Sequence, residues 1–143
     1  MNVHDDDLLQ EVESGRLPLE CFSHAEHVRL TWLYLQRHPL LQAIACFRAT
    51  LQAYAATHGK HGLYHETVTL AFLLLIHERM SGEPATQAWP EFRARHADLL
   101  AWPDNPLFDE YPRDVLSDPV ARDRFVAPRV RNVHSVRTAI AAR

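Results

Sequence analysis

The sequence predicts a single all-α domain over residues 1–143, a compact bundle of about five main helices with a C-terminal wrapped extension. Apolar residues recur at spacings of three and four along most of the chain, which is the period of an amphipathic helix. No stretch alternates apolar and polar residues convincingly enough to form a strand. A chain of 143 residues can bury a core without disulfides or a structural metal, so any metal would serve function.

The first helix is expected over residues 5–14. Three aspartates at its start favour the positive end of the helix dipole, and Gly15 follows the helix as a stop. The stretch RLPLECF, which comes next, is expected to be an irregular connector.

The second helix is expected over residues 23–38. Ser23 and Glu26 have the spacing of a capping box, and Phe22 stands where a hydrophobic staple residue would. Pro39 disfavours helical geometry in the residue before it, so the helix should end there.

The third helix is expected over residues 39–58, with Pro39 in its first turn and Gly59 as its stop. The fourth is expected over residues 64–80. Apolar side chains go nearly all the way round this helix, which indicates a central position with neighbours on several sides.

The fifth helix is expected over residues 88–101, and the proline-rich chain beyond it should wrap around the bundle. One short helix is predicted in this extension, capped by Ser117 or Asp118 with Pro119 in its first turn. Residues 131–143 have little to hold them, and we expect a flexible tail there.

The charge distribution argues against a general nucleic-acid surface. The net charge is −3, although the last 16 residues carry four arginines and no acid, so the remainder of the chain is acidic. The basic tail could contact an acidic partner or lie solvated on the acidic body.

The sequence favours a cytoplasmic protein with no membrane segment. The start MNVHDDDLLQ lacks the basic and apolar regions of a signal peptide, and the longest apolar run, residues 70–76, is far below the roughly 20 residues that span a bilayer. We therefore expect Cys21 and Cys46 to be free thiols.

Two groups of histidines attract attention among the ten in the chain. On the second helix His24, His27, Thr31 and Tyr34 fall on one polar stripe, and histidines three apart can reach one metal ion. His65 is expected in the first turn of the fourth helix, pointing where core residues point, with Glu66 about 100° away around the helix.

We therefore hypothesise a histidine-cluster metal site in a small metalloenzyme that acts on a small molecule. His24, His27 and His65 would bind a divalent Zn, Fe, Ni or Cu ion, and Glu66 would act as acid/base or fourth ligand. The reaction, hydrolase-like or lyase-like, is not specified. The surrounding shell or pocket would comprise Tyr34, Thr31, Tyr64, Thr67, Thr69 and Arg122.

Two alternatives stay open. In the first, the same residues line a metal-free pocket that binds a polar ligand through hydrogen bonds. In the second, the histidines pack inside a structural or interaction protein. A homodimer through Trp32, Trp89 or Trp102 is compatible with the sequence but not required by it.

Three stretches together resemble an uncharacterised family of small all-α bacterial proteins. CFSHAEHVRLTWLYL is similar to its F-x-H-x-x-H motif, GLYHETVT to its Y-H-E-T-x-T motif, and LSDPVARDRFVAPRV to a later arginine-containing motif. The resemblance covers about residues 22–130 and implies no activity. The resemblance places His24, His27, His65 and Glu66 in the signature of that family. It groups the segment around Arg122 with them, which implies that this segment covers or completes the site.

Overall fold

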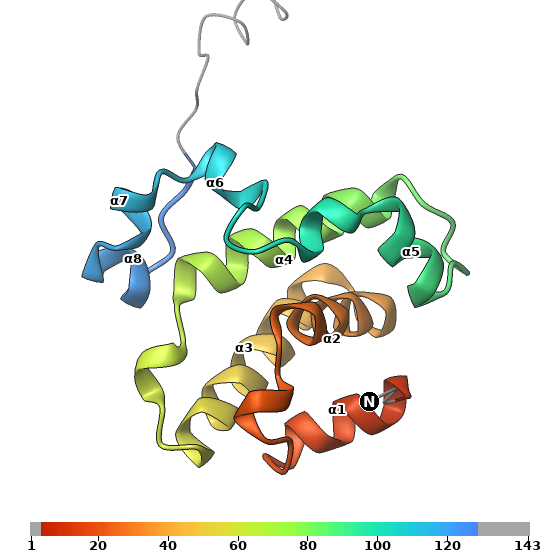
Figure 1. Ribbon diagram of the computed structural model, residues 1–143, viewed down its shortest axis with the longest axis horizontal. Coiled ribbons are helices and arrows are strands. Elements are labelled where there is room, and N and C mark those ends of the chain that lie inside the picture. Colours follow the sequence, from red (N-terminus) through yellow and green to blue (C-terminus); the bar gives the residue numbers. More distant parts are fainter. Residues whose placement is uncertain (1–3, 129–143) are drawn as a thin grey trace, which may run out of the picture.

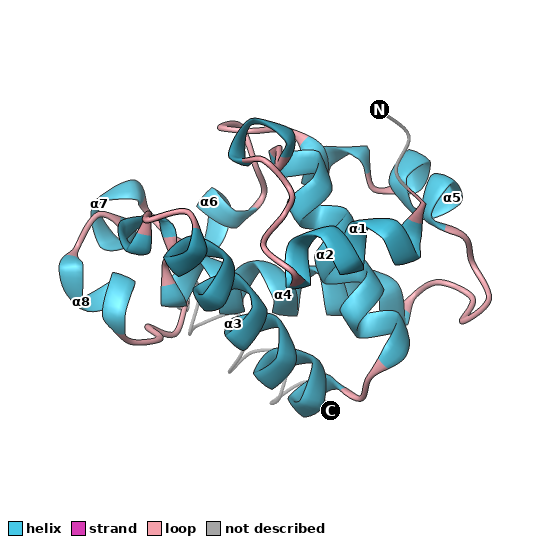
Figure 2. Ribbon diagram, turned by 90° about the horizontal axis from the view of Figure 1, so that it is seen from below, coloured by secondary structure: helices cyan, strands magenta, loops and turns pink. Residues whose placement is uncertain are grey.

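A computed structural model describes residues 4–128 and forms helices without strands over this range, which confirms the all-α fold class (Figures 1 and 2). The predicted flexible tail lies outside the described residues. The longer helices are α1 (Asp5–Glu13), α2 (His24–Arg37), α3 (Leu40–Thr57), α4 (Glu66–Ser81) and α5 (Trp89–Arg95). The shorter elements are η1 (Leu19–Cys21), η2 (His61–Leu63), η3 (Ala97–Leu100), α6 (Leu107–Glu110), α7 (Arg113–Leu116) and α8 (Pro119–Asp123).

The ends of the first three helices follow the signals in the sequence. Gly15 and Gly59 adopt left-handed conformations after α1 and α3, with φ of 76° and 64°, where a side chain would be strained. The Ser23 hydroxyl accepts the N–H of Glu26 at 3.4 Å and so caps α2. Only this half of the capping box forms, because within the described residues the Glu26 carboxylate makes no hydrogen bond to the Ser23 N–H, and its Oε2 atom lies 4.0 Å from Arg29 instead.

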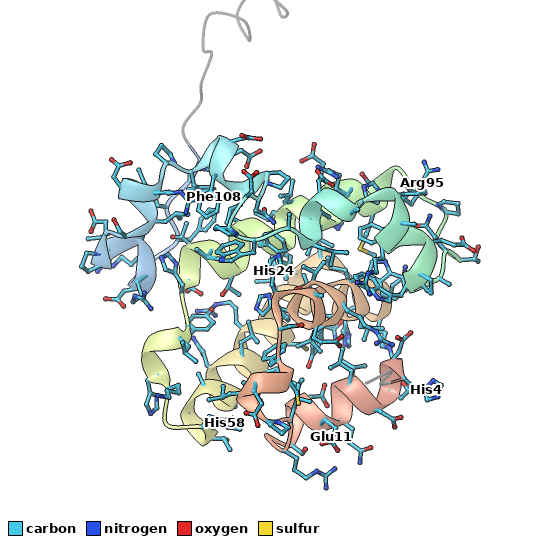
Figure 3. The ribbon with its side chains drawn as sticks, viewed as in Figure 1. His4, Glu11, His24, His58, Arg95 and Phe108 are labelled. Carbon is cyan, nitrogen blue, oxygen red and sulfur yellow. The ribbon has the colours of Figure 1, made fainter. Side chains whose placement is uncertain are left out.

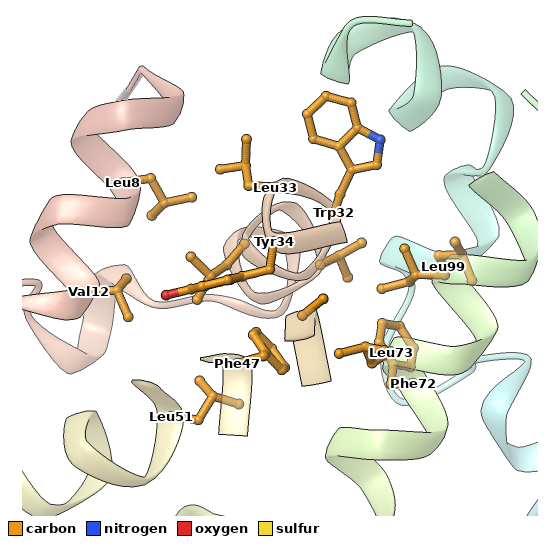
Figure 4. Packing of buried hydrophobic residues seen from close by; sticks show 14 of the residues in the cluster. Leu8, Val12, Trp32, Leu33, Tyr34, Phe47, Leu51, Phe72, Leu73 and Leu99 are labelled. Carbon is orange, nitrogen blue, oxygen red and sulfur yellow. The ribbon is translucent and has the colours of Figure 1, made fainter. Parts of the chain in front are cut away.

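Helix α2 occupies the centre of the hydrophobic core (Figure 4). It packs against α1, α3, α4 and η3, and its Val28, Leu30 and Leu33 are buried. Phe47 of α3 and Leu73 of α4 are fully buried beside it. Each large apolar side chain removed from water contributes about 1.5–3 kcal/mol, so the packing around α2 contributes substantially to stability.

Helix α4 has neighbours on several sides, as predicted, since α2, α3, α6 and α8 all contact it. Phe72 and Ile76 are buried, whereas Leu74 is 39% exposed, so the apolar surface is not enclosed all the way round. The helix begins at Glu66, two residues later than predicted, and His65 is its N-cap with an extended backbone. The prediction that His65 lies in the first turn is therefore wrong.

Helix α5 is shorter than the prediction of residues 88–101. It ends at Arg95 because His96 leaves the helical conformation, and η3 follows. The His96 ring lies between Glu83, at 2.8 Å from Nε2, and Arg79, at 3.2 Å from Nδ1. This pair of side-chain contacts fixes the change of direction after α5.

The C-terminal wrap, residues 106–128, packs beside the first turns of α4, at the opposite end of that helix from α5 (Figures 1 and 2). It contains three short helices rather than the predicted one, because prolines also precede α6 and α7. The prediction for α8 is confirmed: Asp118 accepts the N–H of Val120 at 2.9 Å, and Pro119 opens the helix.

Thr67 joins the C-terminal wrap to α4. Its side chain is fully buried, and its hydroxyl shares its one proton between the carbonyls of Ala121, at 2.6 Å, and Arg124, at 2.9 Å. The same oxygen accepts the N–H of Val126 at 3.0 Å. One hydroxyl therefore links three backbone groups of the wrap at a buried contact, two carbonyls through its shared proton and one N–H through its oxygen.

Among residues 4–128, no helix has the length and apolar character needed to cross a membrane. Trp32 and Trp89 are buried in the core, while Trp102 is 49% exposed. Cys21 and Cys46 are free thiols.

Replacing Thr67 with valine keeps its volume and removes the hydroxyl that holds the wrap. We expect the Thr67→Val variant to lose about 1–3 kcal/mol of unfolding free energy, because buried backbone groups lose their partner. Thr69→Val is the matched control on the same helix, since the Thr69 hydroxyl makes no hydrogen bond within residues 4–128. Its change should stay within about 0.5 kcal/mol. Urea titrations of both variants test this, and equal losses would contradict it.

Candidate functional site

His24 packs against α4 and against η3, the segment after α5 (Figure 3). Its Nε2 donates to the carbonyl of Leu99 at 2.8 Å. The ring packs edge-on against Phe72 at 5.3 Å between centroids and lies 5.1 Å from the ring of Trp102. Burial lowers the pKa of His24, and the hydrogen bond to Leu99 partly offsets that effect.

His65 uses both ring nitrogens to hold the backbone together. Its Nδ1 accepts the N–H of Val68 at 3.1 Å, which caps α4. An N–H can only donate, so the ring proton sits on Nε2, which donates to the carbonyl of Leu116 at 2.7 Å. The imidazole therefore has no lone pair left for a metal ion.

The predicted metal site is wrong. Within the described residues, no group of three or more His, Cys, Asp or Glu side chains could hold a metal ion. His24 and His65 are turned toward the carbonyls of Leu99 and Leu116, and so the histidine cluster does not form. The proposed Zn, Fe, Ni or Cu ion loses its ligand set, and Glu66 loses the metal-bound water that it would have activated.

His27 differs from the other two because its ring makes no hydrogen bond within the described residues. It packs 5.5 Å from Phe22, which is the predicted hydrophobic staple contact, and 5.6 Å from Phe47. Burial, with a smaller repulsion from His24, lowers the pKa of His27 to about 4. The ring is thus a neutral imidazole at neutral pH, with one donor and one acceptor nitrogen.

Glu66 belongs to a closed charge network. Arg48 of α3 binds both of its carboxylate oxygens, at 2.8 and 2.7 Å, and the Tyr64 hydroxyl donates to Oε1 at 2.6 Å. The hydrogen bonds from Arg48 hold the pKa of Glu66 below its usual range. Burial and the hydrogen bond to Glu66 raise the pKa of Tyr64 to about 12. The carboxylate is therefore ionised and already neutralised by its partner.

A pocket of about 310 Å³ lies between η1, α2, α3, η2 and the start of α4. Its volume is at the lower end of the range for small-molecule sites. Leu63, which is 64% exposed, stands in its wall, so the pocket reaches the surface there. The lining consists of Leu19, Phe22, His27, Leu51, Tyr54, Ala55, Leu63, Tyr64 and Thr69.

The pocket contains three of the side chains that the sequence singled out, namely His27, Tyr64 and Thr69. The Thr69 hydroxyl has no partner within residues 4–128, although the residue is only 5% exposed. Neither the His27 nitrogens nor the Thr69 hydroxyl is among the fully buried atoms without a partner. These groups therefore keep contact with solvent, and the pocket is the cavity that both side chains line.

The other predicted site residues lie elsewhere. Tyr34 extends from α2 toward α1, where its hydroxyl donates to Glu13 at 2.7 Å and meets Thr50 at 2.8 Å (Figure 4). Thr31 donates to the carbonyl of His27, one turn back on its own helix, at 2.8 Å. Arg122 donates to the carbonyls of Gly62 and Tyr64. It ties the wrap to the segment that enters α4, and it does not line the pocket.

Some residues of the pocket carried no functional signal in the sequence. Leu51 and Tyr54 belong to the apolar stripe of α3 and are indistinguishable there from core residues. Tyr54 also donates its hydroxyl to the carbonyl of Leu17 at 2.7 Å. Arg48 has no nearby companion in sequence, and only the fold brings it to Glu66. The only sign of the pocket in this part of the sequence is a tyrosine, Tyr54, within the apolar stripe of α3.

Comparison of the chain with protein-family models, with curated proteins and with solved structures gives no match. The relationship to a family of small all-α proteins that three sequence stretches suggest therefore stays a prediction. The functional argument depends on the geometry of the pocket.

The low pKa of His27 has a consequence for stability. The folded pKa of about 4 lies below the ordinary value of 6.5, so the unfolded chain binds more protons between these pH values. The stabilising contribution is complete above pH 6.5 and is lost as the pH falls toward 4. The unfolding free energy of the native protein should therefore fall over this interval, and that of a His27→Gln variant should fall less.

Urea titrations at several pH values measure the two slopes, and an NMR titration of the His27 ring should give a midpoint near 4. The exposed His77 supplies the matched control, as His77→Gln should keep the native slope. A native slope in the His27→Gln variant would contradict the lowered pKa of His27.

Proposed function

We propose that the protein binds a small organic molecule in the pocket beside the start of α4, without help from a metal ion. The observation that carries this proposal is a pocket of about 310 Å³ in which the His27 ring nitrogens and the Thr69 hydroxyl have no hydrogen-bond partner among residues 4–128. Unpaired polar groups inside a mostly apolar cavity are what fix the orientation of a ligand.

The walls of the pocket support the proposal because they are held independently of any ligand. Phe22 packs edge-on against Tyr54 at 5.1 Å, and Tyr54 is anchored to Leu17. Tyr64 is held by Glu66, which Arg48 fixes in turn. A preformed pocket loses little side-chain entropy on binding, so more of the contact energy contributes to affinity.

Substitutions of Ala55 and Leu63, which both line the pocket, should block it in two different ways. Ala55→Phe fills the interior, and Leu63→Trp covers the mouth at a position that is exposed and tolerant of size. We expect each variant to weaken ligand binding at least about tenfold, or about 1.4 kcal/mol. Leu41→Trp is the control, since Leu41 is 80% exposed on α3 and does not line the pocket.

The measurement is ligand-observed NMR with a library of small aromatic and alicyclic fragments, followed by amide chemical-shift mapping on the native protein. Fragments that bind should shift the amides of η1, η2 and the start of α4. Spectra of the variants establish that each is folded. Fragments that bind equally well to Ala55→Phe and native protein would place the binding site elsewhere and sink the proposal.

A further inference from the structure

The geometry points to the class of ligand that the pocket accepts: an uncharged, ring-sized molecule that carries a single hydroxyl or carbonyl group. This inference rests on the proposed function and adds to it the charge and the polar chemistry of the ligand. Three independent features of the pocket support it.

The first feature is that the described part of the chain contributes no formally charged side chain to the pocket lining. None of the nine lining residues is Lys, Arg, Asp or Glu, and its one titratable imidazole, His27, is neutral at neutral pH. An ionic ligand would lose its hydration without gaining a counter-ion, which costs far more than the transfer of a neutral polar group. The pocket therefore selects against ions.

The second feature is that the two charges of the neighbouring ion pair, Arg48 and Glu66, are already bound to each other. Arg48 grips both carboxylate oxygens of Glu66, and the Tyr64 hydroxyl points its proton at the same carboxylate. An anionic ligand would have to compete with Glu66 for Arg48, and a cationic ligand would have to compete with Arg48 for Glu66. Tyr64 lies in the pocket wall, so it screens this pair from the cavity.

The third feature is the match between aromatic surface and free hydrogen-bonding capacity. The rings of Phe22, Tyr54, Tyr64 and His27 surround the cavity, and offset or edge-on contacts with them favour a flat ring. The free polar groups are the Thr69 hydroxyl and the His27 nitrogens, which can both donate and accept. One hydroxyl or carbonyl group on the ligand is enough to engage them.

Aromatic rings also attract cations, so a cationic ligand is the strongest competing class. Among the described residues, the lining offers such a ligand no carboxylate: Glu66 is bound by Arg48, and Glu20, which lies near enough to act on Tyr54, is exposed to solvent and does not line the pocket. A cation in the pocket would thus depend mainly on the ring faces to replace its hydration. The neutral class is favoured for this reason, and the comparison is included in the experiment.

The test uses four probes with the same ring at pH 7.5: benzyl alcohol, toluene, benzoate and benzylammonium. Their affinities for the native protein are measured by amide chemical-shift titration. Benzyl alcohol should bind in the pocket at least about tenfold more tightly than either ion. Thr69→Val should weaken benzyl alcohol about threefold to tenfold and leave toluene unchanged, because only the alcohol loses a hydrogen bond.

Each outcome separates the two proposals. An ion that binds in the pocket as tightly as benzyl alcohol would overturn the inference about ligand charge while the binding function survives. Equal effects of Thr69→Val on benzyl alcohol and toluene would overturn the assignment of the polar group. Failure of all four probes and of the fragment library to shift the pocket amides would overturn both proposals.

Discussion

Hydrogen bonds at the start of α4 join this helix to the C-terminal wrap, and the pocket depends on them. His65 caps α4 through Val68 and binds the carbonyl of Leu116, and the Thr67 hydroxyl links three backbone groups of the C-terminal wrap. Arg122 returns from the wrap to the carbonyls of Gly62 and Tyr64. These contacts fix the backbone on which the pocket side chains Tyr64 and Thr69 stand.

The residues of the stretch YHETVT therefore have two different roles, one in the structure and one in the pocket. His65 and Thr67 face the wrap and serve structure, whereas Tyr64 and Thr69 face the pocket, and Glu66 joins Tyr64 to Arg48. Because Glu66 and Arg48 neutralise one another beside the cavity, the polar motif produces an uncharged pocket. The polar residues His65, Glu66, Thr67 and Thr69 at the start of this apolar helix thus leave no net charge for a ligand to pair with, which agrees with an uncharged ligand.

Local signals in the sequence predict the helices well but do not predict the site. Ser23, Gly15 and Gly59 act within a few residues of themselves, so their effects on helix ends can be read directly. The roles of His24 and His65 are decided by carbonyls 75 and 51 residues away, which no spacing rule reveals. A histidine N-cap is also outside the usual Ser, Thr, Asp and Asn set, so the sequence predicts a start of α4 that is two residues too early.

The most direct test of this account is the protonation pattern of the His65 ring, observed by long-range ¹H–¹⁵N correlation NMR at neutral pH. The account predicts the Nε2–H form, with an unprotonated Nδ1 that accepts a hydrogen bond, and no change when one equivalent of Zn²⁺ is added. A stoichiometric shift of the His65, His24 and His27 nitrogens on adding Zn²⁺ would contradict it. That result would mean that the three rings meet at a metal and do not hold the backbone of α4 and its wrap.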